Sequence, residues 1–282
     1  NSENLEKIKY NLIDSDYFLK LPNSMIRADI DSLTIDLIKK IQTNSINLSD
    51  ICYVVIGAVP HHSKTGASKD RLISRQKEDA NFKPYLEGKD MGRYKLEWRG
   101  IYLNYLPAQM HRPKFKELFE NEKIFVRNIS TKEGLLAVYD SKHFYANDTV
   151  SICIRWDDIK EVNQPGIKPS KEQIVVSREF NLDVLLAFIN SNLTNYYFKK
   201  LLSSNLHVYP EAIRNLPILR RELIPDKDYK RLQECVAVLL DEKIDKKGKK
   251  FQLIDTEVNR IIYKLYELNE SQIKLIESNL PK

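Results

Sequence analysis

Glycine is scarce in this chain, and the scarcity restricts which cofactor-binding folds it can adopt. Only 8 of the 282 residues are glycine, and no two of them are spaced as Gly-x-Gly. A dinucleotide-binding fingerprint and a glycine-rich S-adenosylmethionine loop of the usual kind are therefore absent. The sequence also contains no Gly-x-x-x-x-Gly-Lys phosphate loop and no Gly-x-Ser-x-Gly nucleophile elbow. These absences disfavour several enzyme classes and favour a binding module.

The remaining composition is that of an ordinary globular chain, with 42% hydrophobic and 30% charged residues, long enough for roughly two domains. The 45 Lys and Arg against 39 Asp and Glu give a formal net charge of +6, which permits a polyanionic partner without establishing one. No apolar run approaches the ~18 residues of a membrane span, and residues 1–30 hold no secretory apolar segment. Three isolated cysteines fit a reducing compartment, so we expect a cytoplasmic protein without membrane contact.

Apolar periodicity divides the chain into three parts. Residues 1–46 predict a helical lead-in, with Asp29 and Asp31 as candidate caps of an apolar stripe over 30–41. Residues 47–224 predict a sheet-rich body with packed helices, in which Asn181 caps one long helix over 182–197. Its strands are expected at 51–55, 101–105, 124–127, 135–139, 150–155 (half-buried, by its period-two pattern) and 174–176. Residues 225–282 predict a helical tail, with Gly248 as a helix stop in the exposed connection 241–250. The expected fold class is α+β.

The segment HHSKTGASKDRLISRQK, over 61–77, is the most informative basic stretch. It carries five Lys or Arg residues against the single acid Asp70. A flexible basic loop of this kind suits a phosphate backbone, and a solvated polar loop is the alternative. We expect no zinc site at His61 and His62, because neighbouring side chains rarely converge on one metal.

One nuclease-like pattern also occurs. Pro225 and Asp226, followed by Asp245 and Lys247, formally fit a PD…(D/E)xK arrangement, which uses two carboxylates to hold Mg²⁺. That chemistry needs the carboxylates on adjoining strands, whereas the second half lies in a charged, turn-like run without a β-rich flank. We therefore attribute the match to chance.

Seven segments, taken in order, resemble one protein family. They are LSDICYVVIGAVP (48–60), FKPYLEGKDMGRYKLEW (82–98), KIFVRNIS (123–130), FYANDTVSICI (144–154), DVLLAFINSNLTNYYF (183–198), IRNLPI (213–218) and IDTEVNRIIYKLYELNESQIKLIE (254–277). The set resembles the TaqI-like C-terminal specificity domain of bacterial adenine-N6 DNA methyltransferases, including fused type IIG restriction–modification enzymes. Loop 61–77 departs from the family pattern, as expected where members recognise different sequences.

The resemblance implies a DNA target-recognition domain over 47–224 that presents one adenine to a methyltransferase domain. We expect that catalytic half, with its Asn/Asp-Pro-Pro-Tyr motif and its S-adenosylmethionine, to precede this chain, because the motif does not occur here. No catalytic residue, cofactor or metal ligand is then expected within these residues. The expected partners are double-stranded DNA and the methyltransferase domain, with a nuclease domain as a further candidate. The alternative is a protein-interaction module that docks a methyltransferase or nuclease subunit through its C-terminal helices.

Base-specific contacts are expected from side chains on loops in the major groove, since only that groove distinguishes all four base pairs. Arg127 and Asn128 end a predicted strand, where Arg can pair with guanine and Asn with adenine. The alternative for Arg127 is an ion pair with a carboxylate inside the fold. The residues expected to contact DNA are His61, His62, Lys64, Lys69, Arg71, Arg75, Lys89, Arg93, Arg127, Asn128, Lys132, Lys199, Asn205 and His207.

Overall fold

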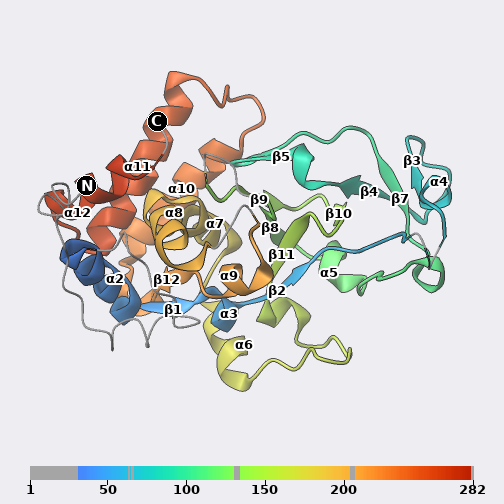
Figure 1. Ribbon diagram of the computed structural model, residues 1–282, viewed down its shortest axis with the longest axis horizontal. Coiled ribbons are helices and arrows are strands. Elements are labelled where there is room, and N and C mark those ends of the chain that lie inside the picture. The colour runs from blue at the N-terminus through green and yellow to red at the C-terminus, as the bar shows by residue number, and fades with distance from the viewer. Residues whose placement is uncertain (1–30, 63, 65–66, 130–133, 204–206, 281–282) are drawn as a thin grey trace, which may run out of the picture.

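The computed structural model describes residues 31–62, 64, 67–129, 134–203 and 207–280. Helices gather at one end of the molecule and sheets at the other (Figure 1), so the α+β expectation is confirmed. The central sheet is antiparallel in the order β2 (Cys52–Ile56), β11 (Val150–Arg155), β8 (Lys123–Arg127) and β9 (Ala137–Asp140). A second sheet has the order β10 (Tyr145–Ala146), β4 (Phe82–Leu86), β7 (Tyr102–Asn104) and β3 (Ile73–Ser74), with β10 parallel to β4.

The central sheet is buried on both faces, and its alternating side chains feed two separate hydrophobic cores. On β8, Ile124 and Val126 pack into the core shared with the helices, while Phe125 packs into the core shared with the second sheet. On β11, Ile152 faces the second sheet. Strand 150–155 is therefore not half-buried as expected, because the helices cover its other face and bury Ser151 and Cys153 as well.

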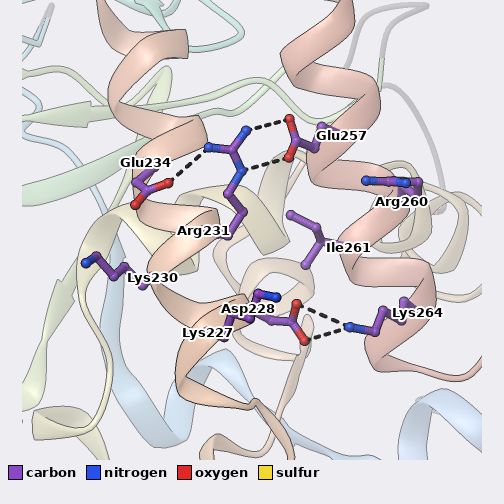
Figure 2. A pocket seen from close by; sticks show the side chains of 9 residues that line it. All are labelled: Lys227, Asp228, Lys230, Arg231, Glu234, Glu257, Arg260, Ile261 and Lys264. Atoms are coloured by element: carbon purple, nitrogen blue, oxygen red, sulfur yellow. Dashed lines mark hydrogen bonds and ion pairs between the residues drawn. The ribbon is translucent and has the colours of Figure 1, made fainter.

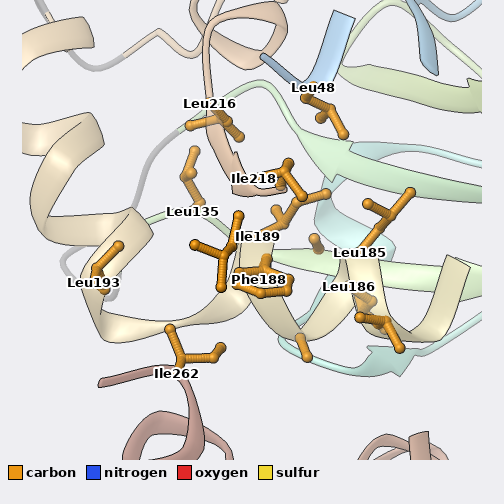
Figure 3. Packing of buried hydrophobic residues seen from close by; sticks show 14 of the residues in the cluster. Leu48, Leu135, Leu185, Leu186, Phe188, Ile189, Leu193, Leu216, Ile218 and Ile262 are labelled. Carbon is orange, nitrogen blue, oxygen red and sulfur yellow. The ribbon is translucent and has the colours of Figure 1, made fainter. Parts of the chain in front are cut away.

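The helical core is built around α7 (Leu182–Asn190) and α8 (Asn192–Tyr197), which Figure 3 shows from close by. Phe188 and Ile189 of α7 lie among Leu216, Ile218 and Ile262, contributed by other parts of the chain. The helices that complete this end are α2 (Ser32–Asn44), α10 (Asp226–Leu240), α11 (Lys249–Leu265) and α12 (Glu270–Ser278). The shorter elements are β1 (Ser45–Asn47), α3 (Leu48–Ile51), α4 (Lys69–Leu72), β5 (Met91–Gly92), β6 (Lys95–Leu96), α5 (Glu117–Glu120), α6 (Lys171–Arg178), α9 (Pro210–Arg214) and β12 (Pro217–Leu219), with short 3-10 turns between some of them and the π-helical turn η6 (Phe198–Leu202).

Asparagine side chains fasten α7 and α8 to the edge of the central sheet. The Asn190 amide donates to the Ala137 carbonyl (2.9 Å) and accepts from its N–H (3.0 Å). The side-chain oxygen Oδ1 of Asn195 accepts a hydrogen bond from the Leu135 N–H (2.6 Å). Because β9 is an edge strand, these amides supply hydrogen bonds that a further strand would otherwise make.

Three sequence predictions differ from the structure because of the residues at which helices begin and end. The helix expected over 182–197 is broken at Ser191, whose hydroxyl accepts from the Thr194 N–H (3.1 Å) and starts α8. Residues 174–176 lie in α6 instead of a strand, because Ser170 and Gln173 form a capping box ahead of them. Gly248 precedes α11 as its N-cap and stops no helix, since α10 already ends at Leu240. Asn181 precedes α7, but its side chain makes no capping bond.

The lead-in and the tail join the body through the same core. Asp31 caps α2 by accepting from the Thr34 N–H (2.8 Å), whereas Asp29 lies outside the described residues. Strand β1 pairs with β12, and side chains of α2, α10 and α11 share one core with α7. That core crosses both expected boundaries, at 46/47 and 224/225, and the division into three domains stays a prediction.

Two further sequence observations concern cysteines and membranes. Cys52, Cys153 and Cys235 are free thiols buried among apolar side chains, as their isolated spacing indicated. In the part of the chain that the structure describes, no helix is both long and apolar enough to cross a membrane.

One ion pair is fully buried at the end of the central sheet. Lys123 of β8 lies opposite Asp140 of β9, and their Nζ and Oδ2 atoms are 2.6 Å apart with both side chains inaccessible to solvent. Lys123 also donates to the Asn121 carbonyl, and Asp140 accepts from the N–H groups of Lys142 and Phe144. Burial lowers the pKa of Lys123, and the charge of Asp140 opposes that shift.

We expect Asp140→Ala to destabilise the protein by about 3–5 kcal/mol, because it leaves the Lys123 ammonium buried without its counter-charge. The double variant Lys123→Met, Asp140→Leu should lose less, since it buries no charge. Urea unfolding measures both, with Lys116→Ala, which removes an exposed partner of Glu120, as the matched control. Equal losses in the single and the double variant would contradict this assignment.

Candidate nucleic-acid interface

A two-stranded ribbon extends β2 toward the second sheet and carries the histidines of loop 61–77. Val59 exchanges two backbone hydrogen bonds with Arg112 (both 2.9 Å), and the His111 N–H donates to the Pro60 carbonyl (3.1 Å). The His62 and His111 rings stack with centroids 4.8 Å apart. We call residues 58–62 and 109–112 the histidine ribbon. Figure 1 shows the chain running from β2 to the end of the molecule where β3, β7 and α4 lie.

The cations that follow the histidine ribbon are exposed. Lys69 and Arg71 lie on the short helix α4, Arg75 follows β3, and Lys64 lies in the turn after His62. The expectation of a flexible loop is therefore wrong for residues 69–74, because Leu72 is buried and β3 pairs with β7. Within the described ranges, no carboxylate lies within ion-pair distance of these four side chains. Unneutralised Lys and Arg side chains on an exposed surface are what a phosphate backbone attracts.

A second group of candidates lies where β8 ends, next to Gly57 and the start of β11. There Gly57, at the end of β2, meets the turn before β11 so closely that a Cβ on it would lie 2.3 Å from the Asn147 carbonyl oxygen. The Gly88 N–H donates to the Thr149 hydroxyl (2.7 Å), and a Cβ on Gly88 would lie 3.4 Å from Arg127 Cγ. Only glycine fits at position 57. Its close approach to Asn147 brings the end of β2 next to the start of β11 and the end of β8.

Arg127 and Asn128, at the end of β8, differ in the contacts that their side chains make. The Asn128 amide is committed inside the protein, donating to the Asp148 carbonyl (2.7 Å) and accepting from the Ser151 hydroxyl (2.6 Å). Arg127 has no carboxylate partner in the described residues, and its buried Nε makes no hydrogen bond there. The ion pair considered for Arg127 is therefore not found among the described residues. Asn128 instead fixes the geometry of the strand end through its two hydrogen bonds.

Other candidates are divided between the interface and the helical end. Lys89 pairs with Glu87 (2.7 Å) beside Gly88, and His207 forms a β-bridge with Ile129 at the end of β8. Arg93 is directed into the protein, where it binds Asp255 (2.6 Å) and the Asn190 carbonyl (2.6 Å). Burial raises the pKa of Asp255, and the Arg93 charge opposes the rise.

Three further candidates complete the set. Lys199 donates to the Asn279 carbonyl (2.7 Å) at the helical end, away from the histidine ribbon. Lys132 and Asn205 lie outside the described residues. Contact with DNA stays a prediction for every candidate, and the geometry gives Arg93, Asn128 and Lys199 structural tasks.

Several residues at this surface carry no signal that the sequence patterns above detect. His111 and Arg112 pair with the histidine ribbon from a remote segment, and the basic run HRPKFK at 111–116 could have drawn attention to them. Ile129 and Tyr209 are large apolar side chains with 42% and 53% of their surface exposed, on either side of the β-bridge to His207. Nothing in their local pattern distinguishes them from core residues.

The helical tail presents a different surface, a cavity of about 600 Å³ between α10 and α11. Its charges are largely paired across the two helices (Figure 2). Arg231 binds Glu257 through two hydrogen bonds (2.7 and 2.9 Å), and Lys264 binds Asp228 (3.1 Å). These pairs fasten α10 to α11, and they leave Lys227, Lys230 and Arg260 as lining cations without an ion pair to the described residues.

Comparison with protein families identifies the central part of the chain. Residues 83–218 match the model of the TaqI-like C-terminal specificity domain, so this segment is similar to that family. The segments quoted from 123–130, 144–154, 183–198 and 213–218 fall inside the match, whereas 48–60 and 254–277 fall outside it. No protein of curated function matches the sequence.

Solved structures of similar shape come from restriction–modification systems. A structure of the type IIL restriction-modification enzyme MmeI in complex with DNA is 6% identical, covering 82% of this chain and 35% of that one, with a TM-score of 0.47. The type IIG restriction endonuclease BpuSI is 10% identical over 86% and 34% of the two chains, with a TM-score of 0.41. The HsdS subunit from Thermoanaerobacter tengcongensis is 13% identical over 83% and 50%, with a TM-score of 0.37. The chain spans about a third to a half of the length of these proteins.

The stacked histidines predict that binding of a polyanion strengthens as pH falls. Desolvation lowers the pKa of His111, and His62 and Arg112 lower it further. A nearby phosphate favours the protonated ring, so affinity should rise as pH is lowered from about 8 through the imidazole pKa. Fluorescence anisotropy of a labelled DNA duplex measures this rise.

The matched variant His111→Phe retains a ring for stacking and should flatten the pH dependence. His143→Asn, in an exposed turn away from the ribbon, should retain it. An unchanged pH profile in His111→Phe would refute a role for the stacked pair.

Proposed function

We propose that this chain is the sequence-specific DNA recognition part of a restriction–modification adenine-N6 DNA methyltransferase. The catalytic domain, which would bind S-adenosylmethionine and transfer the methyl group, lies outside these residues. In this proposal the chain itself is not catalytic. Its task is to bind the target duplex and hold it while one adenine is presented to the catalytic domain. A nuclease domain is a further candidate partner in the same enzyme.

The exposed cations after the histidine ribbon carry the proposal. Lys64, Lys69, Arg71 and Arg75 come from one loop, and none has a carboxylate partner among the residues that the structure describes. Contacts of such side chains with phosphates supply affinity and set the register of the duplex, without reading its sequence. The match of residues 83–218 to a specificity-domain model supports DNA as the polyanion.

Sequence discrimination is assigned to the end of β8. Arg127 comes from a strand buried on both faces, and the Asn128 amide ties that strand end to Asp148 and Ser151. A rigid platform fixes the direction in which a guanidinium can approach guanine O6 and N7, which a flexible loop cannot do. Presentation of an adenine outside the helix costs unstacking energy, so the flanking duplex must be held firmly.

The alternative function is docking of a methyltransferase or nuclease subunit through the C-terminal helices. The cavity between α10 and α11, where Arg260 lacks an ion pair to the described residues, is the observation in its favour. The two functions predict different salt dependence, because release of counterions from DNA makes its binding fall steeply with salt.

Duplex binding by the chain should show a slope of log K against log [salt] of roughly −3 to −5, equivalent to about 3–6 phosphate contacts. Lys69→Ala should weaken binding to all sequences and reduce the slope by about one. Lys230→Ala removes an exposed lysine of the α10–α11 cavity and serves as the control, which should bind as the unmodified protein does. A slope near zero, or an effect confined to Lys230→Ala, would favour the docking alternative.

Arg127 and Asn128 should respond differently to alanine substitution. Arg127→Ala breaks no hydrogen bond among the described residues and should cost about 1–3 kcal/mol on the cognate site only, relaxing specificity at one base pair. Asn128→Ala removes two internal hydrogen bonds and should lower the melting temperature without changing base preference.

Methylation rates of the enzyme that contains this chain, on duplexes substituted at single positions, separate the two outcomes when melting temperatures are measured beside them. A uniform loss across the panel for Arg127→Ala would contradict base recognition by this residue.

A further inference from the structure

A second cavity, of about 600 Å³, lies between the β5–β6 hairpin, the turn after β9 and the connection from α10 to α11. Its walls are mainly apolar and aromatic, from Tyr94, Leu96, Trp98, Phe144 and Leu240. A cavity of this size accommodates a small organic molecule, and such sites combine apolar walls with a few polar groups. It is separate from the histidine ribbon, none of whose residues line it.

The aromatic wall is held in a fixed arrangement. The Trp98 indole N–H donates to the Ile101 carbonyl (3.0 Å), which sets the orientation of the ring. Trp98 also meets the rings of Tyr102 and Phe144 edge-on, at centroid distances of 5.1 and 5.6 Å. Despite these contacts 36% of its surface stays exposed. A planar ligand could therefore stack on Trp98 without rearranging the wall.

Three lysines line the cavity together with the carboxylates of Asp140 and Glu242, and one of the lysines forms no ion pair with the described residues. Lys142 pairs with Glu242 (2.5 Å) and Lys95 with Glu97 (2.5 Å). Lys246 donates to the carbonyls of Leu239 and Asp241, and no carboxylate of the described residues lies within ion-pair distance of it. Burial lowers the pKa of Lys246, the nearby positive charge of Lys95 lowers it further, and the charges of Asp241 and Glu242 oppose the shift. An anion at this position would stabilise both ammonium groups.

We propose that this cavity binds a planar aromatic carboxylate of small-molecule size. The ring lies against Trp98 and Phe144, and the carboxylate lies between Lys95 and Lys246. Because Lys95 belongs to β6 and Lys246 to the connection between α10 and α11, the ligand joins the specificity domain to the helical tail.

Isothermal titration calorimetry with indole-3-acetate tests the proposal, with indole-3-acetamide as the uncharged probe of the same shape. We expect saturable one-to-one binding of the carboxylate and affinity about tenfold or more lower for the amide, because only the carboxylate forms charge-assisted hydrogen bonds. Absence of binding by indole-3-acetate, or equal affinity for the two probes, would overturn the proposal.

Two variants test the placement of the carboxylate. Lys246→Gln and Lys95→Gln should each weaken binding of indole-3-acetate by about tenfold, while Lys247→Gln, an exposed neighbour that does not line the cavity, should bind normally. Lys95→Gln keeps the test decisive if Lys246→Gln disturbs the carbonyls that Lys246 contacts. Normal binding by Lys95→Gln, or equal weakening by Lys247→Gln, would overturn the assignment.

Discussion

The two-sided burial of the central sheet is the constraint on which the rest of the structure depends. Side chains of β8 and β11 alternate between the helical core and the core shared with the second sheet, so a shift of one residue in register would exchange both sets. The Lys123–Asp140 pair adds an electrostatic condition to the same register, because the two residues lie directly opposite on β8 and β9. Hydrophobic packing and charge therefore select one alignment.

That alignment has a functional consequence at the other end of β8. A strand packed on both faces has little freedom, and its last residues project from a fixed position. Arg127 leaves the sheet there, while Gly57 and the Asn128 amide draw the adjoining strand ends together around it. The cations after the histidine ribbon are also held by secondary structure, since Lys69 and Arg71 lie on α4 and Arg75 follows β3, which pairs with β7. They differ from Arg127 in exposure: their side chains are exposed, whereas Arg127 is half-buried at the strand end. The proposed division between base recognition at the edge and phosphate contact on segment 61–77 follows from this difference.

The sequence predicted the parts of the fold whose patterns are long enough to repeat. Strands β2, β8, β9 and β11 and the apolar stripe of α2 were placed within a few residues, and the tail was predicted to be helical. Residues 174–176 were assigned to a strand because β-branched composition outweighed the capping signal of Ser170 and Gln173. For the site, loop 61–77 was found from composition, whereas the pairing of His62 with His111 depends on contacts between segments remote in sequence, which no local pattern contains.

A modest net charge can serve DNA recognition where exposed cations lie close together in the chain. Ion pairs occur at both ends of the molecule, for example Arg231 with Glu257 among the helices and Lys89 with Glu87 beside the central sheet. Cations without an ion pair to the described residues also occur at both ends, and Lys230 and Arg260 are examples on the helices. The formal charge of +6 therefore does not by itself favour one end. In the proposed function, what distinguishes segment 61–77 is that its exposed cations follow one another within a few residues, as contacts with successive phosphates require.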